Sequence, residues 1–285
     1  MFMTSSPALF HPRNLSEALD LLATTADARP LSGGASLVAM MNAGLVAPAA
    51  LVSLTRIPEL CGIRVSAAGD IAIGAATRHN EIAGDGRLSG TAAVLADAAA
   101  QIAGTAVRNM GTIGGAIAHA DPALDFPSAL VAVEATVEIA SSAGRRLVPI
   151  REFFVDWYTT VLAPSEIVAA VHIHKPKHGV GIYLKHARVA GDFAIVSVAV
   201  TLARDGEVHV AIGGCGPSPL ASAEADRILS SDLSRSASTR AGDLLAALAN
   251  PVDDVRGSAK YRKVLIPRML ARALHDAVAA SRSAA

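Results

Sequence analysis

The run VRNMGTIGGAIAHADPALD, residues 107–125, decides how the rest of this sequence is interpreted. At its centre, the pair Gly114-Gly115 follows the small hydroxyl residue Thr112. A similar segment, SGGAS at residues 32–36, carries a second glycine pair. Because glycine has no side chain, its backbone N–H group can approach a ligand closely, and consecutive amides can form a concave anion site. Two such segments predict a site that binds a diphosphate.

Ordinary turns are the alternative for each glycine pair, since glycine is common wherever the chain reverses. The segment at 32–36 directly precedes a helix predicted over residues 36–43, whose N-terminus would add unpaired N–H groups and partial positive charge. Neither segment has the Gly-x4-Gly-Lys-Ser/Thr pattern of a P-loop, and neither has Gly-x-Gly-x-x-Gly after a strand. An anion site here would belong to neither of those two types.

Composition excludes several classes of protein. The 25 basic and 25 acidic residues cancel, and no long basic block exists, so we expect no nucleic-acid partner. Much of the apolar content is alanine, and no apolar run approaches the roughly 18 to 20 residues that span a bilayer. The N-terminal sequence lacks a secretory signal, which predicts a cytoplasmic protein. The only cysteines, Cys61 and Cys215, are too few for a four-thiolate cluster, a zinc ribbon or a disulfide framework, so any metal would belong to another chain.

Helix and strand patterns follow one another in mixed order along residues 1–176. They lack regular β-α-β alternation, which favours an α+β fold over a doubly wound parallel sheet. Thr77 is the predicted N-cap of one helix, and residues 107–125 are predicted as a loop. Helices are expected at 14–24, 36–43, 78–84, 91–103, 127–133 and 150–154, and strands or hairpins at 50–57, 62–74, 136–149 and 166–173.

A charged segment with proline and glycine, residues 174–179, is typical of a domain boundary. Beyond it, three strand patterns predict an antiparallel meander, followed by helices in which Pro267 would kink the last one or begin a fresh first turn. The predicted domains are 1–176, with subdomains of about 1–57 and 58–176, and 177–285. The expected strands are 180–187, 194–203 and 207–212, and the expected helices are 221–230, 235–248 and 258–281.

Residues 107–125 closely resemble the FAD-binding signature of the medium, flavin-carrying subunit of the molybdenum hydroxylases, the family of carbon monoxide dehydrogenase and xanthine dehydrogenase. Residues 32–36 resemble that family's Gly-Gly-x-Ser loop, and KHARVAGDFA at 185–194 resembles the segment that opens its C-terminal domain. Order, spacing and length agree along nearly the whole chain. The resemblance implies a two-part N-terminal FAD-binding domain of the PCMH or vanillyl-alcohol-oxidase type, then a C-terminal domain of a three-stranded antiparallel sheet with helices.

The resemblance also implies which residues surround FAD. Two departures, Ala35 and Ala116, replace polar residues that are common in the family, so the FAD affinity and potential could differ from family norms. Lys185 matches a lysine near the flavin, where a cation stabilises the negative charge of the reduced ring. The implied cofactor-binding residues are Ser32, Gly33, Gly34, Ala35, Ser36, Leu37, Ile102, Ala103, Thr112, Gly114, Gly115, Ala116, Asp125, Val168, Lys185 and Phe193.

The function implied by the resemblance is electron transfer. The chain would take electrons from a partner's [2Fe–2S] clusters and pass them to NAD+, a quinone or oxygen. Its partners would be a large molybdopterin subunit and a small subunit with two [2Fe–2S] clusters, in a dimer of heterotrimers. Two alternatives stay open, namely a self-contained FAD-dependent oxidoreductase and a scaffold subunit that has lost FAD. The sequence identifies no catalytic acid–base residue.

Three further groups have competing interpretations. His172 and His174 could ligate a metal or lie at a solvated strand end, and the second is favoured because no cysteine or carboxylate accompanies them. His119 and Asp121 could be an acid–base pair, but a structural role in the motif is favoured. Cys215 is predicted to be buried and unreactive, because no basic neighbour in the sequence lowers its pKa.

Overall fold

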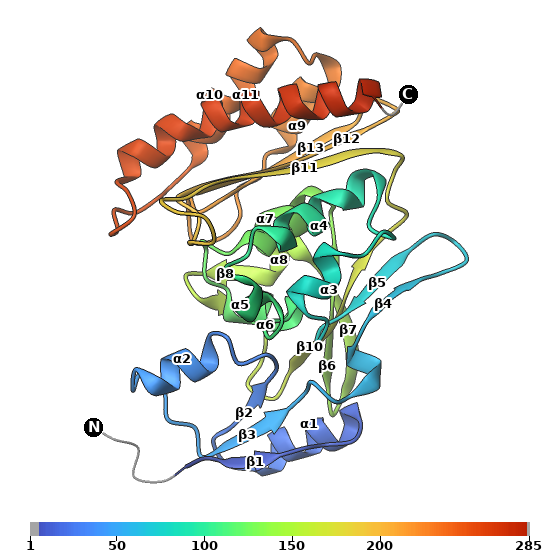
Figure 1. The fold of residues 1–285 in the computed structure, drawn as a ribbon, viewed down its shortest axis with the longest axis vertical. Coiled ribbons are helices and arrows are strands. Elements are labelled where there is room, and N and C mark those ends of the chain that lie inside the picture. The colour runs from blue at the N-terminus through green and yellow to red at the C-terminus, as the bar shows by residue number, and fades with distance from the viewer. Residues whose placement is uncertain (1–5, 284–285) are drawn as a thin grey trace.

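The computed structural model describes residues 6–283, which stack in three parts along the long axis of the molecule (Figure 1). The N-terminal part lies at one end, a central part with most of the short helices follows, and the C-terminal part lies at the other end. No helix within residues 6–283 is long and apolar enough to cross a membrane. The mixed order of helices and strands is the predicted α+β fold.

The N-terminal part is a parallel three-stranded sheet with a helix packed on it. Helix α1 (Leu15–Thr24) begins where predicted, because the Asn14 side chain accepts a 2.9 Å hydrogen bond from the Glu17 N–H and caps the first turn. The short helix α2 (Leu37–Asn42) follows the first glycine segment. The strands lie in the order β1-β3-β2 and are β1 (Ala8–Phe10), β2 (Ala28–Leu31) and β3 (Ala50–Ser53).

The central part is built on an antiparallel five-stranded sheet in the order β4-β5-β10-β6-β7. Helix α7 (Asp125–Ala132) is buried at all eight positions, because it lies between this part and the C-terminal sheet. The strands are β4 (Ile63–Val65), β5 (Ile71–Gly74), β6 (Thr136–Ser141), β7 (Gly144–Pro149) and β10 (Ile167–Ile173), with a separate hairpin of β8 (Phe154–Asp156) and β9 (Thr159–Thr160). The other helices are η1 (Pro58–Leu60), α3 (His79–Ala83), η2 (Gly90–Ala92), α4 (Ala93–Ala100), α5 (Thr105–Arg108), α6 (Ile113–His119) and α8 (Ile150–Phe153).

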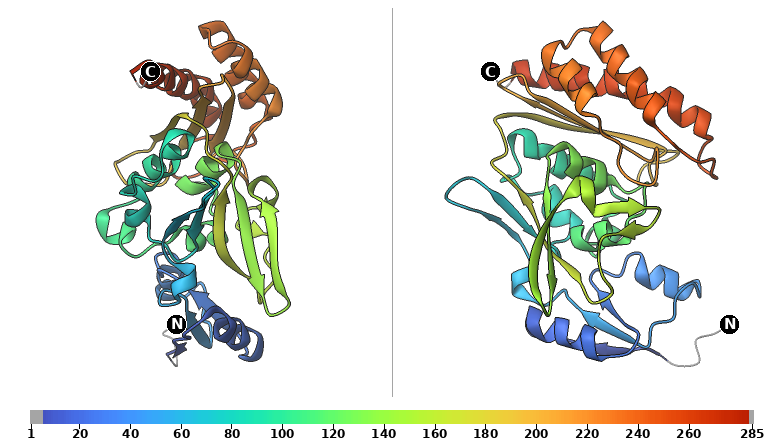
Figure 2. Two further views of the ribbon diagram at one scale, coloured as in Figure 1. Left: turned by 90° about the vertical axis from the view of Figure 1, so that its right-hand side faces the viewer. Right: turned by 180° about the vertical axis from the view of Figure 1, so that it is seen from behind.

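The C-terminal part is the predicted three-stranded antiparallel sheet with helices. Its strands are β11 (Gly179–His186), β12 (Val196–Ala203) and β13 (Val208–Gly213), and its helices are α9 (Ala223–Ser231), α10 (Arg235–Leu248) and α11 (Ala259–Ser283). Figure 2 shows these helices over one face of the sheet, while the green helices of the central part cover the other. Every residue of β12 is buried, as expected for a strand covered on both faces.

The β11–β13 sheet therefore joins two hydrophobic cores. Val198 and Val200 point into the core shared with α10 and α11, whereas the intervening Ala199 belongs to the core of the central part. Thr201, also on the central side, donates a 3.2 Å hydrogen bond to the Ala132 carbonyl of α7. Small side chains on that face let α7 approach the sheet closely.

Pro267 lies inside the continuous helix α11, so it neither ends this helix nor begins a new one. Gly242 of α10 faces it, and a Cβ at that glycine would lie 2.6 Å from the Pro267 Cα. A glycine is required here because the two helices approach closely at this point.

Two helix predictions need correction. The helix predicted at 78–84 begins at His79, and Thr77 does not cap it, since the Thr77 hydroxyl donates to the Gly62 carbonyl at 3.1 Å. The helix predicted at 91–103 ends at Ala100, and Ala103 is left-handed with φ 41°. The Arg108 side chain donates to the carbonyls of Ile102 and Ala103 at 2.9 and 2.7 Å, a local contact that the apolar pattern of the helix does not reveal.

The prediction of a loop over 107–125 is also wrong in part, because α6 runs through it. Thr112 is the N-cap of α6 and accepts a hydrogen bond of 3.2 Å from the Gly115 N–H. The glycine pair thus lies in the first turn of a helix, where glycine is unfavourable by about 1 kcal/mol relative to alanine. Such glycines need a packing or functional reason.

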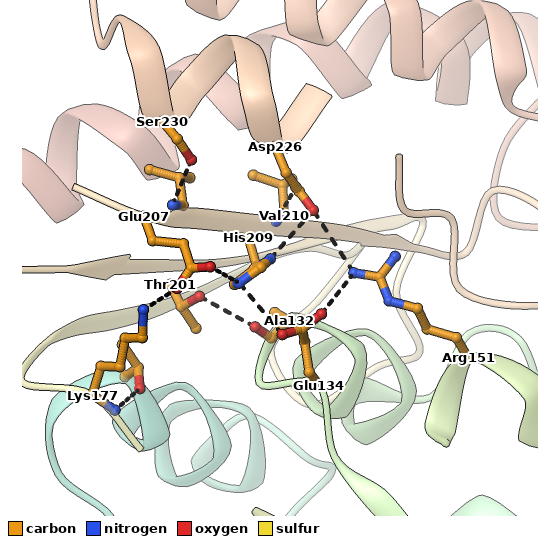
Figure 3. A network of polar contacts seen from close by, with 12 residues as sticks. Ala132, Glu134, Arg151, Lys177, Thr201, Glu207, His209, Val210, Asp226 and Ser230 are labelled. Atoms are coloured by element: carbon orange, nitrogen blue, oxygen red, sulfur yellow. Dashed lines mark hydrogen bonds and ion pairs between the residues drawn. The ribbon is translucent and has the colours of Figure 1, made fainter. Parts of the chain in front are cut away.

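A cluster of charged side chains joins the central and C-terminal parts (Figure 3). His209 of β13 lies 3.4 Å from Asp226 of α9 and 3.5 Å from both Glu207 and Glu134, the last of which follows α7. Arg151 of α8 is 3.7 Å from Asp226. Interaction with Asp226, Glu134 and Glu207 raises the pKa of His209 above its usual range. When protonated, the ring bridges carboxylates from both parts.

Candidate functional site

The two glycine segments, 80 residues apart in sequence, lie against each other. The hydroxyls of Ser32 and Thr112 are hydrogen-bonded at 2.8 Å. Any side chain at Gly33 would collide with the Met110 carbonyl oxygen, so this position requires glycine. The packing that joins the segments explains Gly33 without any ligand.

A row of free backbone amides distinguishes the first segment. Within residues 6–283, the N–H groups of residues 33–37 donate to no protein acceptor, and Ser36 makes no side-chain cap at the start of α2. Gly34 has a φ of 74°, a left-handed conformation that favours glycine and aligns successive amides. Unpaired amides of this kind need an acceptor from water or a ligand. The segment therefore fits the phosphate oxygens of a diphosphate.

The second segment is held more by protein contacts. The Gly114 N–H donates to the Ala75 carbonyl at 2.8 Å, and a Cβ at Gly114 would lie 2.5 Å from the Ala75 Cβ. Gly114 is therefore required by packing against the end of β5. Gly115 is exposed, and a Cβ there would lie 3.0 Å from the Thr112 hydroxyl.

A buried histidine, His79, packs against the second segment. The His79 N–H donates to the Gly111 carbonyl at 3.0 Å, and the His79 ring lies 5.3 Å from the Phe126 ring. A Cβ at Gly111 would lie 2.5 Å from His79 Nε2. Burial, with a smaller contribution from Arg108, lowers the pKa of His79 to about 4. The ring is therefore neutral at pH 7, and its Nδ1 has no partner among the described residues.

A buried ion pair lies between α7 and β11. Lys185 Nζ is 3.0 Å from Asp125 Oδ1, and each side chain is 5% exposed. Lys185 Nζ also donates to the Gln101 carbonyl at 3.1 Å. The Tyr183 hydroxyl donates to Asp125 Oδ1 at 2.7 Å. Burial raises the pKa of Asp125, and the charge of Lys185 and the Tyr183 hydrogen bond oppose that rise.

A cavity of about 560 Å³ opens beside this ion pair. Lys185 and Gln101 contribute to its wall, together with residues that precede and form α5 and with the segment that follows β11. Within the described chain, the lining contains no histidine, tyrosine or carboxylate, but it contains three cationic side chains, Arg108, Lys185 and Arg188. The full lining is Ala100, Gln101, Ala103, Gly104, Thr105, Arg108, Lys185, Ala187, Arg188, Val189, Ala190 and Gly191.

The remaining predicted residues fall in different surroundings. Ile102 and Val168 are buried in the central core, and Ala116 packs against that core. Phe193 is 39% exposed and lies under the Arg256 guanidinium, 4.8 Å from the ring centre. Of the implied flavin-end residues, Ala103 and Lys185 line the cavity and Asp125 is hydrogen-bonded to Lys185 behind it, whereas Ile102, Val168 and Phe193 do not line it.

Three residues of this site were not identified from the sequence: Gln101, Arg108 and Tyr183. Tyr183 is two positions from Lys185, and in a strand such residues share a face, so the alternation of β11 contained a usable signal. Arg108 is inside the run 107–125 but had no assigned role. The interaction of Gln101 with β11 spans 82 residues, and no local pattern in the sequence indicates it.

The other candidate groups have structural roles. The expectation that no carboxylate accompanies the two histidines is wrong, because His172 Nε2 is 2.7 Å from Glu138 and His174 Nδ1 is 3.6 Å from Asp70. Each histidine has one carboxylate neighbour, and no group of three possible metal ligands occurs in residues 6–283. The Asp121 carboxylate accepts from the Ala123 N–H at 2.9 Å, which agrees with the favoured structural role. Cys215 is 1% exposed, and burial raises its pKa to about 12, as expected for an unreactive thiol.

Two family descriptions match this chain. The FAD binding domain in molybdopterin dehydrogenase matches residues 3–176. The CO dehydrogenase flavoprotein C-terminal domain matches residues 182–277. Together they cover almost the entire sequence.

Individual relatives agree over the full length. The 6-hydroxypseudooxynicotine dehydrogenase complex subunit alpha of Paenarthrobacter nicotinovorans is 37% identical over 93% of each chain. The carbon monoxide dehydrogenase medium chain of Hydrogenophaga pseudoflava is 35% identical over 93% of this chain and 95% of the relative. A solved carbon monoxide dehydrogenase of Hydrogenophaga pseudoflava, lacking the Mo-pyranopterin moiety of its molybdenum cofactor, superimposes with a TM-score of 0.92 at 34% identity, covering 96% of this chain and 98% of that one.

Proposed function

The chain belongs to the family of FAD-binding flavoprotein subunits of molybdenum hydroxylases, and from this we propose that it relays electrons between a partner's iron–sulfur clusters and a final acceptor. As a member, it is an FAD-binding subunit of an oxidoreductase. The proposed acceptor is NAD+, a quinone or oxygen. The observation that carries the proposal is the buried Lys185–Asp125 ion pair beside the cavity.

The proposed partners are a large molybdopterin subunit and a small subunit with two [2Fe–2S] clusters, in a cytoplasmic dimer of heterotrimers. Support comes from relatives that are named as one chain of an assembly, a complex subunit in one case and a medium chain in another. We also propose domains at 1–176, with subdomains of about 1–57 and 58–176, and 177–285. The two family matches end and begin on either side of the boundary near 177, which supports this division.

The diphosphate of FAD is proposed to lie on the first glycine segment. The unpaired N–H groups of residues 33–37 would donate to its oxygens. Ser32 and Thr112 hold the second segment against the first, so Gly115 and Ala116 would border the same site. Ala35 and Ala116 add no polar side chain, which leaves the backbone as the source of hydrogen bonds at these two positions.

The flavin ring is proposed to lie at the cavity with Lys185. When bound, FAD supplies the redox chemistry, and the protein supplies binding, orientation and electrostatics. The ammonium of Lys185 would favour negative charge on the ring, and Asp125 would hold that ammonium in place. Ile102, Ala103, Val168 and Phe193 are the residues proposed to surround the ring; of these, Ala103 lines the cavity, and the other three would contact the ring outside its lining.

The self-contained oxidoreductase is disfavoured by the cavity itself. Such an enzyme needs an acid–base residue within hydrogen-bonding reach of its substrate. Within the described residues, the cavity wall has no histidine, tyrosine or carboxylate, and its lysine, Lys185, is already engaged by Asp125 and the Gln101 backbone carbonyl. An electron carrier needs no proton-transfer residue for a substrate, so the lining supports that role.

The scaffold without FAD is disfavoured by two costly features. Burying an ion pair such as Lys185–Asp125 costs desolvation energy that a purely structural interface could avoid with apolar residues. Five consecutive amides without a protein acceptor are also unfavourable unless water or a ligand binds them. Both features support retention of a charged ligand.

Co-purification of the chain from its source under native conditions tests the relay. We expect two partner chains, with molybdenum in one of them, and one FAD per copy of this chain. Removing FAD from the assembly should abolish acceptor reduction, and adding FAD back should restore it. Full acceptor reduction by the FAD-free assembly would overturn the proposal.

A further inference from the structure

Lys185 is the first of three buried polar groups linked by hydrogen bonds, and the last of them is the phenol of Tyr183. Tyr183 is 2% exposed, and its hydroxyl donates to Asp125 Oδ1 at 2.7 Å. The two oxygens of Asp125 lie 3.0 and 3.1 Å from Lys185 Nζ. Asp125 therefore receives a neutral donor on one side and a cation on the other.

The second partner of Lys185, Gln101, is also hydrogen-bonded to strand β11. Gln101, at the end of α4, donates from its side chain to the Tyr183 carbonyl at 3.0 Å, while its own carbonyl accepts from Lys185 Nζ at 3.1 Å. A lysine ammonium has three N–H donors. Both Asp125 oxygens and the Gln101 backbone carbonyl lie within 3.1 Å of this ammonium, which belongs to a side chain that lines the cavity.

Packing fixes the position of the phenol. A Cβ at Gly181, two residues before Tyr183 on the same face of β11, would lie 2.5 Å from the Val94 backbone N, so the strand approaches α4 closely there. The hydroxyls of Ser128 and Ser197 also interact with the phenol. A side chain at Gly213 would collide with the Ser197 hydroxyl, so this glycine leaves room for the serine pair.

The phenol acts on the charge of Asp125. Burial alone favours the neutral carboxyl, and a donated hydrogen bond favours the carboxylate. The phenol remains a donor because burial and the adjacent Asp125 raise its pKa well above the usual range. Loss of the carboxylate would leave the Lys185 ammonium buried without a counter-charge, which is strongly unfavourable.

We infer that Tyr183 is a positioning residue, whose phenol keeps Asp125 ionised so that Asp125 holds the Lys185 side chain at the cavity wall. The link between Tyr183 and the flavin rests on the proposed function. The primary test does not depend on that function, because protonation of the Asp125 carboxyl can be measured in protein that contains no flavin.

The test compares two replacements at position 183 that have nearly the same shape. Tyr183→Phe removes the donor, and we expect Asp125 to bind a proton about tenfold more tightly, as seen by carbon-13 NMR titration of its carboxyl in the flavin-free chain. A 3-fluorotyrosine placed at this position alone is a more acidic, stronger donor. It should weaken proton binding by Asp125. Tyr261→Phe removes a half-exposed phenol elsewhere and should leave Asp125 unchanged.

The inference is supported if the two replacements shift the pKa of Asp125 in opposite directions. A loss of packing alone would not make the direction of the shift depend on the strength of the hydrogen-bond donor. An Asp125 titration that is the same in wild type and in both variants would overturn it. The fluorotyrosine retains the hydroxyl, so it decides the question if Tyr183→Phe folds poorly. In the FAD-loaded chain, Tyr183→Phe should keep FAD and lower its midpoint potential. A wild-type chain that never binds FAD would contradict the proposed function, while the carboxyl titration would still decide the role of Tyr183.

Discussion

Lys185 and Asp125 form an ion pair in which Nζ and Oδ1 are 3.0 Å apart and both side chains are almost completely buried. One residue comes from β11 and the other from the start of α7, so the pair also connects the C-terminal sheet to the central part. The cavity opens beside the cation.

Lys185→Met keeps an apolar chain of similar length and removes the charge. We expect FAD to remain bound and its midpoint potential to fall, because a cation near the reduced ring stabilises negative charge. Removing one partner of a buried pair should also lower the free energy of unfolding by about 3 kcal/mol. Potentiometric titration and denaturant unfolding measure the two effects. Lys185→Arg retains the charge and is the control, and an unaltered potential in Lys185→Met would assign Lys185 a structural role only.

Gly33→Ala should separate the two glycine segments. The added methyl group meets the Met110 carbonyl, which is backbone and cannot rotate away. We expect the free energy of unfolding to fall by at least about 2 kcal/mol and FAD content to drop. Gly86→Ala is the matched control, because nothing lies within 4 Å of its Cβ position. Equal FAD content in both variants would mean that contact between the segments is not needed for binding.

Acid should destabilise the protein through His79. Its pKa in the folded state, about 4, is below the unfolded value of about 6.5. The folded state therefore prefers the neutral ring, and its stabilising contribution is complete above pH 6.5 and is lost as the pH falls toward 4. The loss is on the order of 3 kcal/mol. Denaturant unfolding at pH 7 and pH 4 measures it. If the free energy of unfolding of His79→Leu falls by the same amount between pH 7 and pH 4, the effect belongs to other groups.

A rise in pH should weaken the contact between the central and C-terminal parts, because His209 loses its proton. Its pKa is raised by Asp226, Glu134 and Glu207, so its contribution is complete below the unfolded pKa and is lost as the pH rises through the folded value. Arg151 remains charged and keeps part of the attraction. Hydrogen exchange of the Val210 amide, which donates to Asp226, should quicken above pH 7 beyond the intrinsic effect of pH. An identical pH response in His209→Gln would contradict this role.

The elements that follow from local pattern were predicted well. The β11–β13 meander was predicted from three consecutive strand patterns, and the structure confirms it. Helix α1 has both a cap and an apolar face in its sequence. By contrast, β1 is three residues long and pairs in parallel with β3, 42 residues away. No local pattern specifies such a pairing.

The residues of the candidate site also fall into two groups, those that the sequence identified and those that depend on tertiary packing. The glycine segments were identified from their residues and, with Asp125 and Lys185, from the resemblance to a family. The structure places the two segments against each other and pairs Asp125 with Lys185. Gly114 was assigned to ligand approach, but packing against Ala75 accounts for it. The contacts of Gln101 and Tyr183 depend on how α4 meets β11, which is a tertiary arrangement. Alternation along β11 places Tyr183 on the same face as Lys185, but it does not indicate where α4 packs against that strand.

Binding of FAD by the isolated chain is the most direct test of the electron-carrier account. The purified chain, reconstituted with FAD and separated from excess, should show the yellow flavin absorption with one FAD per chain. Dithionite should bleach that absorption and air should restore it. A chain that folds but stays colourless after reconstitution would contradict the account.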